Sequence, residues 1–244
     1  MKKVFAILAM AAVVAVACSK DDGTGKKKKD KDEGETTYVA PITIDGDFSD
    51  WAKLDANKVS TATCAADALK TALKTVKVYA DETYVFIYFE FDKDQITWKQ
   101  DVEHVPFHLY INGDGDASTG GFGDQFSDAC VDLLCEGFLT DGNDFASYDP
   151  GAFKWNGEAN GTGWSWEGVL DEGAGLCSGA GKGNAYEIRL TREMYPLEGG
   201  LADNFSIGFD IQQSWSSVGI LPNANVTDDN VNGLAPMLAV KTVK

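Results

Sequence analysis

Short runs in which apolar and polar residues alternate recur along most of the chain, and each run predicts a β-strand. The strongest run is 84–92, YVFIYFEFD, which is apolar on both faces as far as Glu90 and therefore predicts a central strand covered on both sides. Its two expected faces are Val85, Ile87, Phe89 and Phe91 on one side, and Tyr84, Phe86, Tyr88 and Glu90 on the other.

Further strands are expected at 76–80, 106–111, 186–190, 205–211 and 238–243, and a hairpin is expected where 153–157 and 163–167 flank a glycine- and asparagine-rich turn. Helical patterns are scarce, since residues 65–74 and 191–195 each allow only a turn or two. With 26 glycines between many short strands, the pattern predicts an all-β fold, an antiparallel β-sandwich of the jelly-roll kind. We expect it to form a single domain over residues 38–244.

The first residues have the pattern of an export signal. Residues 1–3 are basic at two positions, and 4–17 form an uncharged apolar run that is too short to span a bilayer as a helix, which takes about 20 residues. The run ends in Ala-Val-Ala before Cys18, which resembles the lipobox of bacterial lipoproteins. We therefore expect residues 1–17 to be a signal peptide and Cys18 to carry covalent lipid such as palmitate, the alternative being a plain signal peptide with a chance cysteine.

Residues 18–37 are almost without apolar side chains, so they cannot offset the entropy of ordering and are expected to form a disordered, charged tether. The Ser-Lys-Asp-Asp sequence after Cys18 resembles signals that send lipoproteins to the outer face of the outer membrane. This predicts an outer-membrane lipoprotein that faces the cell surface, the alternative being an inward-facing one.

The net charge of the chain limits the classes of partner that it can bind. The whole sequence has a formal net charge of −17, and residues 38–244 carry 13 Lys and Arg against 32 Asp and Glu, which is −19. Such a domain is repelled by nucleic acid and by anionic lipid, and it is compatible with neutral ligands and with cations.

Four cysteines remain after Cys18, and in an oxidising compartment they predict two disulfides with three possible pairings: Cys64, Cys130, Cys135 and Cys177. We favour a local Cys130–Cys135 clamp, which requires a bend, and a long Cys64–Cys177 link. A zinc site is not expected, because there is no Cys-x-x-Cys and only two histidines, His104 and His108.

Several segments, taken in order, resemble family 9 carbohydrate-binding modules and their DOMON-like relatives. These segments are 42–51 (ITIDGDFSDW), 76–91, 110–116 (YINGDGD) with 118–120 (STG), 164–166 (WSW), 186–190 (YEIRL) and 219–222 (GILP). The resemblance covers nearly all of 42–244 and implies a β-sandwich binding domain that is not an enzyme. Members of these folds bind sugar or haem, so the resemblance is less specific for the ligand than for the fold.

The aspartate-rich loop is the best candidate metal site. It supplies oxygen at every second residue from Asn112, Asp114, Asp116 and Ser118, and calcium takes six to eight such ligands. Asp128 matches the trailing aspartate of the family and is expected to complete the ligand set. The alternative is a solvated turn, because Asn, Asp and Gly are common in turns.

Sugar binding would depend on tryptophans, because indole rings stack on the apolar faces of sugar rings. Trp51 is expected in the core, and Trp164 and Trp166 share one face that we expect to point inward. Trp98, Trp155 and Trp215 lie near turns and are the candidate platforms, with Asn156 nearby to bind hydroxyls.

The sequence therefore predicts a lipid-anchored, non-catalytic glycan-binding protein. Two alternatives stay open. One is a structural or interaction lipoprotein of the same fold, and the other is a haem-binding domain that would use His104 or His108, or more distantly Met194 or Met237. Acid pairs for glycoside hydrolysis lack a distinguishing context, which argues against an enzyme.

Overall fold

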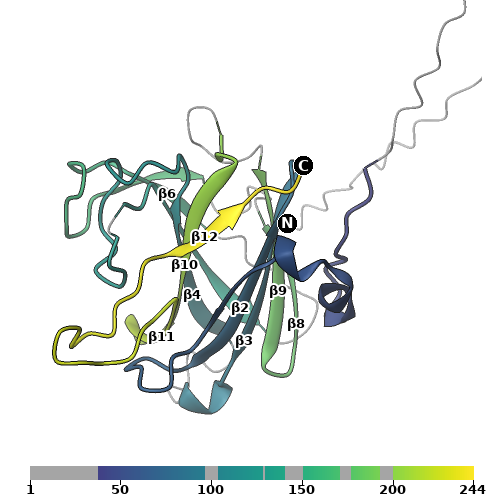
Figure 1. Ribbon diagram of the computed structural model, residues 1–244, viewed down its shortest axis with the longest axis horizontal. Coiled ribbons are helices and arrows are strands. Elements are labelled where there is room, and N and C mark those ends of the chain that lie inside the picture. The colour runs from purple at the N-terminus through teal and green to yellow at the C-terminus, as the bar shows by residue number, and fades with distance from the viewer. Residues whose placement is uncertain (1–37, 97–103, 129, 141–150, 171–176, 193–199) are drawn as a thin grey trace, which may run out of the picture. The chain divides into compact units, whose positions relative to one another are not determined.

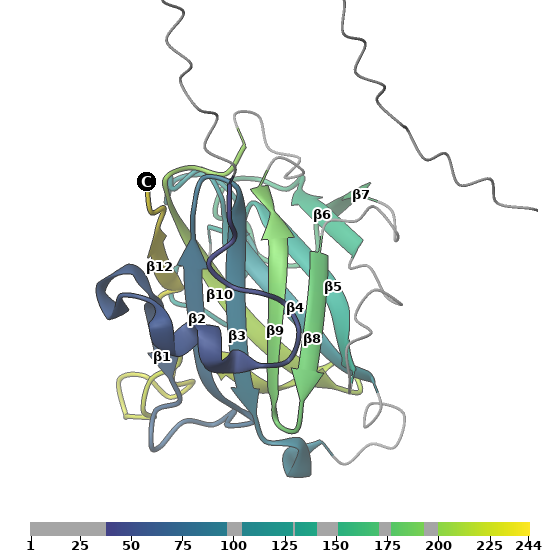
Figure 2. The same ribbon diagram turned by 90° about the vertical axis from the view of Figure 1, so that its right-hand side faces the viewer.

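The computed structural model describes residues 38–96, 104–128, 130–140, 151–170, 177–192 and 200–244. Within it, Ala40–Lys244 forms one compact unit built from two antiparallel β-sheets that pack face to face (Figures 1 and 2). The predicted all-β sandwich is confirmed. The predicted signal peptide and tether lie outside the described residues. No helix in the described part of the chain is long and apolar enough to cross a membrane.

The smaller sheet has five strands in the order β1 (Ser60–Thr63), β2 (Leu73–Ala80), β3 (Tyr84–Phe91), β9 (Ala185–Thr191) and β8 (Cys177–Lys182). The strand predicted to be central, β3, lies between β2 and β9 and is covered on both faces. Its alternate residues Val85, Ile87 and Phe89 point into the main core, as expected from the period of two.

The larger sheet has the order β11 (Ser216–Leu221), β10 (Asn204–Gln213), β4 (His104–Asn112), β5 (Leu133–Thr140), β6 (Gly151–Trp155) and β7 (Trp166–Leu170). The short β12 (Leu238–Lys241) also pairs with β10. Phe107, Leu109 and Ile111 of β4 point into the main core, where Phe89 meets Phe209 edge to face at 5.5 Å between ring centroids. The expected β6–β7 hairpin is present.

The outer face of the five-stranded sheet is closed by the segment that precedes β1. Trp51, in the 3₁₀ helix η1 (Phe48–Lys53), packs with Ile42 against Phe86 of β3, so the core position expected for Trp51 is confirmed. Glu187 of β9 is fully buried there and accepts three hydrogen bonds, from the backbone N–H groups of Asp45 and Gly46 and from Trp51 Nε1 at 3.0 Å. These donors offset the cost of burying the carboxylate.

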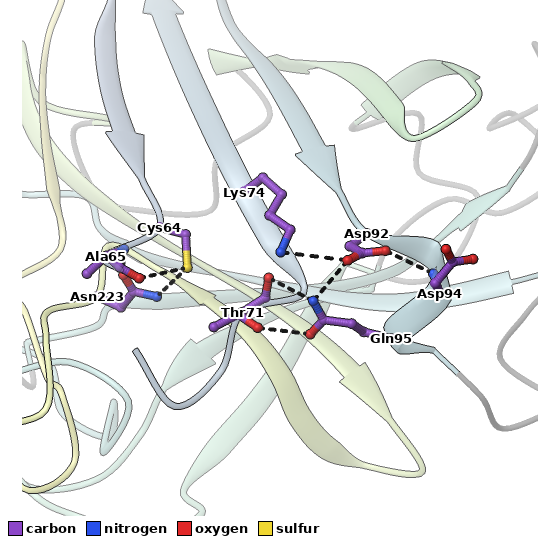
Figure 3. A network of polar contacts seen from close by, with 8 residues as sticks. All are labelled: Cys64, Ala65, Thr71, Lys74, Asp92, Asp94, Gln95 and Asn223. Carbon is purple, nitrogen blue, oxygen red and sulfur yellow. Dashed lines mark hydrogen bonds and ion pairs between the residues drawn. The ribbon is translucent and has the colours of Figure 1, made fainter. Parts of the chain in front are cut away.

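The predicted helical turn at 65–74 is wrong. Residues 65–72 form turns and bends before β2 begins, and the second 3₁₀ helix, η2 (Ala56–Lys58), lies earlier in the chain. Side-chain hydrogen bonds hold the 65–72 segment in place (Figure 3). The Asn223 amide donates to the sulfur of Cys64, and the Thr71 hydroxyl donates to the side-chain oxygen of Gln95 in η3 (Lys93–Gln95). Of the second expected turn, 191–195, only the first two residues are described, and Thr191 ends β9.

Neither favoured disulfide forms. Cys130 packs in a cluster on the outer side of the seven-stranded sheet, whereas Cys135 of β5 points into the main core between the sheets. Because the two side chains lie on opposite faces of one sheet, they cannot bond to each other. The predicted bend between them does not bring the sulfurs together.

The long link fails for a different reason. Cys64 directly follows β1, and Cys177 begins β8, which is the opposite edge of the five-stranded sheet. Four strand spacings of about 4.8 Å separate these edges, whereas the Cα atoms of a disulfide lie roughly 4.4–6.8 Å apart. Cys64 instead has a free thiol that donates to the Ala65 carbonyl at 3.5 Å (Figure 3).

Candidate functional site

The outer face of the seven-stranded sheet carries the side chains that could bind a ligand. Register places Asp210 of β10, His108 of β4 and Glu136 of β5 side by side in one row across three strands. The next row contains Tyr110 and Leu134, with Phe153 of β6. A polar row and an aromatic row therefore lie next to each other, and the loop 113–131 packs on the aromatic one.

A buried carboxylate fixes the start of this loop. Asp132 accepts hydrogen bonds from the backbone N–H groups of Gly113 at 2.8 Å and Asp114 at 3.4 Å. Burial raises the pKa of Asp132, and the nearby charges of Asp114 and Asp116 raise it further, although the two backbone bonds oppose that shift.

The far end of the loop is tied to the β6–β7 hairpin. Gly121 pairs with Val131 and with Gly161, and its Cα lies so close to the indole of Trp155 that a β-carbon there would come within 2.4 Å of the ring. Only glycine fits this approach. The next residue, Phe122, has a φ of 51°, a strained value for a bulky side chain, and its N–H donates to Gly161 at 2.7 Å.

Phe122 belongs to a surface group that we call the aromatic shelf, which consists of Phe122, Trp164 and Trp166. Both indoles meet Phe122 edge to face, at 5.9 Å for Trp164 and 5.7 Å for Trp166. Trp164 is 64% exposed, so packing in a core does not explain why a large apolar side chain lies at this position. The strained Phe122 and the exposed Trp164 make this shelf a candidate binding surface.

Tyr110 joins the shelf to the polar row, which we define as His108, Glu136, Asp210 and Gln212. Its ring stacks on Phe122 at 6.0 Å, and its hydroxyl lies 3.1 Å from His108 Nδ1. Gln212 Nε2 donates to His108 Nδ1 at 3.1 Å and to Asp210 Oδ2 at 3.0 Å, and His108 Nε2 lies 3.3 Å from Glu136 Oε1. This network assigns the proton of His108 to Nε2.

Burial governs the ionisation of this row. It lowers the pKa of His108 to about 4, so the imidazole is neutral at physiological pH. It raises the pKa of Asp210 to about 6 and also raises that of Glu136. Ser217 and Gln212 bind one oxygen of Asp210, whereas Oδ1 has no hydrogen-bond partner in the described part of the chain.

The haem alternative now concerns His108, because the side chain of His104 and all of Met194 lie outside the described residues. Both ring nitrogens of His108 are engaged, and the ring is buried. Met237 is buried in the cluster under the loop. A haem iron would have to replace the contact of His108 with Gln212 or with Glu136.

The predicted sugar platforms have different environments. Trp155 is buried, with its Nε1 bound to the Glu158 carbonyl, so it packs the loop and offers no exposed face. Trp215 is 78% exposed at the tip of the β10–β11 hairpin, where Ser214 and Trp215 both have positive φ. Asn156 is exposed beside the hairpin, and Trp98 lies outside the described residues.

The aspartate-rich loop is satisfied by its own donors. Asp116 Oδ1 accepts from the backbone and the hydroxyl of Ser118, Asp114 Oδ2 accepts from Thr119, and Asn112 Oδ1 accepts from Gly115. Asp128 is directed elsewhere, to the backbone N–H of Met237 at 2.9 Å. In the described ranges, no three His, Cys, Asp or Glu side chains are grouped so that they could hold a metal.

Sequence reasoning missed the central residues of this site. It expected the shared face of Trp164 and Trp166 to point inward, and Phe122 had no signal because it lies in a glycine-rich loop. The one available signal was the period of two, which sets His108 and Tyr110 on the opposite face from Phe107 and Leu109. It did not show that Asp210 would lie beside them, because that depends on strand order.

Comparison with known proteins adds a similarity of fold. No protein-family model matches the sequence, and no curated protein matches it. One solved structure that it resembles is a family 9 carbohydrate-binding module from Caldicellulosiruptor kristjanssonii in complex with cellotriose. The alignment covers 84% of this chain and 90% of the module, with 12% identity and a TM-score of 0.40.

Asp210 predicts a specific pH dependence of stability. Burial raises the pKa of Asp210 in the folded state to about 6, above the ordinary aspartate value of 3.8, so the folded state holds this proton more tightly, and the resulting stabilisation is lost as pH rises through 6. The shift of roughly two units corresponds to about 3 kcal/mol. We expect Asp210→Asn, which mimics the protonated acid, to gain stability relative to wild type between pH 4 and pH 7.5 in urea unfolding.

The control is Asp94→Asn, which neutralises an exposed aspartate. The free energy of unfolding of this variant should change with pH in the same way as that of the wild type. If the curves of Asp210→Asn and wild type also run parallel, Asp210 does not titrate in this range.

Proposed function

We propose that this chain is a non-catalytic carbohydrate-binding protein, anchored by lipid at Cys18 to the outer membrane and facing the cell surface. The observation that supports sugar binding is the aromatic shelf, with the exposed Trp164 held against Phe122 and Trp166. A sugar ring presents apolar C–H groups on its face, and an exposed indole offers the flat apolar surface on which such a face stacks.

The surroundings of the shelf suit a neutral ligand. The hydroxyls of a stacked sugar need hydrogen-bonding groups around the shelf. The exposed Asn156 and the partly exposed Gln125 and Glu136 would supply them. The net charge of −17 is compatible with neutral polysaccharide and opposes binding of nucleic acid. The similarity in fold to a module solved with cellotriose concerns that protein, and the ligand of this chain is proposed from its own side chains.

Trp215 is a second proposed contact. It lies at the β11 edge and at the opposite end of the strands from Trp166, which pairs with Trp155. From the rise along the strands and the spacing across them, Trp166 and Trp215 are roughly 35 Å apart. A disaccharide cannot contact both tryptophans, whereas a polysaccharide chain can.

This separation gives a test with two ligands. We expect Trp164→Ala to lower the affinity for a short neutral oligosaccharide such as cellobiose or xylobiose at least tenfold in calorimetry, because it removes the stacking face. Trp215→Ala should leave that affinity unchanged and weaken only the retardation by polysaccharide in native affinity gels.

The two variants are matched controls, since each removes one exposed indole. If a panel of oligosaccharides and polysaccharides gives no binding to the wild type at millimolar concentration, the proposed function is wrong. Binding that is unaffected by Trp164→Ala would place the sugar site elsewhere.

The lipid anchor is proposed from the sequence before Cys18. Each buried methylene of an acyl chain contributes about 0.8 kcal/mol to membrane binding, so two or more chains hold a protein stably. Expressed in a bacterium that processes lipoproteins, the wild type should enter the detergent phase of a Triton X-114 partition, and Cys18→Ala should stay in the aqueous phase. Cys64→Ala is the control, and a Cys18→Ala protein that still enters detergent would rule the anchor out.

A structural calcium ion at the aspartate-rich loop is proposed as well. Asp114 and Asp116 would supply charge, and Asn112 and Ser118 neutral oxygen, if the hydroxyls of Ser118 and Thr119 rotate away. Calcium chloride should then raise the melting temperature, and the increase should vanish in Asp114→Asn/Asp116→Asn. It should persist in Asp228→Asn/Asp229→Asn, an exposed pair elsewhere. An unchanged melting temperature of the wild type would exclude the ion.

A further inference from the structure

A cavity lies at the edge of the sandwich, away from the aromatic shelf. It has a volume of about 610 Å³ and lies where η2 and β1 of one sheet approach β12 and the start of β10. Figure 2 shows β12 and the C-terminal end of the chain on this side, near β1. The volume is within the usual range for small-molecule sites.

Three lysines line this cavity, which we call the lysine groove. Lys58 ends η2, Lys241 ends β12, and Lys244 lies at the last position. Lys244 is paired with Asp203 at 2.6 Å, whereas no described acidic side chain lies within ion-pair distance of Lys58 or Lys241. The hydrogen bond to Asp203 and, to a smaller extent, the charge of Glu82 raise the pKa of Lys244, so the positive charge of the lining that is not already balanced comes from Lys58 and Lys241.

A fourth cation stands behind the wall of the groove. The buried guanidinium of Arg192 donates to the Thr242 hydroxyl at 3.0 Å, and Thr242 lines the groove. Arg192 also lies near Asp203, where its charge helps to lower the pKa of that carboxyl, although the largest cause is the hydrogen bond from Lys244. The positive potential of the groove is thus partly built into the fold.

The walls of the groove are held by both sheets. Thr242 N–H donates to Asp203 and Val243 N–H donates to Ala80, each at 2.8 Å, while the Ser60 hydroxyl donates to Ala239 at 2.8 Å. These bonds connect β1, β2, β10 and β12, so the groove is formed before any ligand arrives. Pre-formed walls distinguish it from lysines scattered on a mobile surface.

The overall charge of the chain does not cancel this local field. Charges separated by more than about 8 Å are largely screened at physiological ionic strength. A small anion in the groove therefore responds to Lys58, Lys241 and Lys244 more than to distant carboxylates. Lys58 and Lys241 are exposed and have no acidic partner among the described residues, which favours an anion in a groove of a chain whose net charge is −17.

We propose that the lysine groove binds a carboxylate-bearing sugar, such as a uronic acid unit of an acidic glycan. The lysines would bind the carboxylate, and Asn204 with the Ser60 hydroxyl would bind ring hydroxyls. None of the described residues that line the groove is aromatic, so recognition is proposed without stacking. Recognition depends on charge and hydrogen bonds, and the site is independent of the aromatic shelf.

The probe is a galacturonic acid disaccharide, compared with its methyl ester, which keeps every hydroxyl and loses the charge. We expect calorimetry at low salt to show binding of the acid at least tenfold tighter than the ester, weakening as sodium chloride rises. Lys58→Gln and Lys241→Gln should each weaken binding about two- to fivefold, and the double variant about tenfold.

Lys182→Gln, at the far edge strand β8, is the control and should bind as the wild type does. Trp164→Ala should also leave this binding intact, which separates failure of the groove from failure of the shelf. Equal binding of acid and ester, no effect of the two lysine substitutions, or equally tight binding of inorganic phosphate would each overturn the proposal.

Discussion

The buried carboxylate of Glu187 determines which faces of the sandwich remain available for binding. It holds the segment before β1 onto the five-stranded sheet through two backbone donors and the indole of Trp51. A carboxylate without such donors would be costly to bury, so Glu187 needs the hydrogen bonds of the segment, and the segment is held on the sheet by Glu187. With that face closed, the outer face of the seven-stranded sheet and the sandwich edge are left for ligands.

On the open face, a second constraint arranges the groups proposed to bind a ligand. Tyr110 stacks on Phe122 and its hydroxyl lies 3.1 Å from His108 Nδ1, so this one residue joins the aromatic shelf to the polar row. The shelf is further held by the close approach of Gly121 to Trp155. The buried Trp155 thus supports the site from beneath, and the exposed Trp164 is the residue that can meet a sugar.

The sequence predicted local structure better than it predicted neighbours. The period of two placed Val85, Ile87 and Phe107 in the core, because alternation along a strand is a local property. The pairings of Cys64 and Cys130 were wrong, because they depend on which strands form the edges of a sheet and on which face a loop packs. The shelf was missed for the same reason: Phe122 and Trp164 are 42 positions apart and meet only because Gly121 pairs with Gly161.

The aspartate-rich loop connects the two proposed binding sites. At one end of the loop, Gly115 has a φ of 72° and packs so closely on the Asn204 carbonyl that a β-carbon on Gly115 would lie 2.5 Å from it. Gly115 and Asn204 both line a hollow of about 260 Å³. This hollow shares Ser60 and Lys241 with the lysine groove. At the other end, Phe122 enters the aromatic shelf. Asp132 fixes the beginning of the loop through the backbone N–H of Gly113. Stacking at the shelf and charge at the groove are expected to respond differently to salt, since added salt screens only the second.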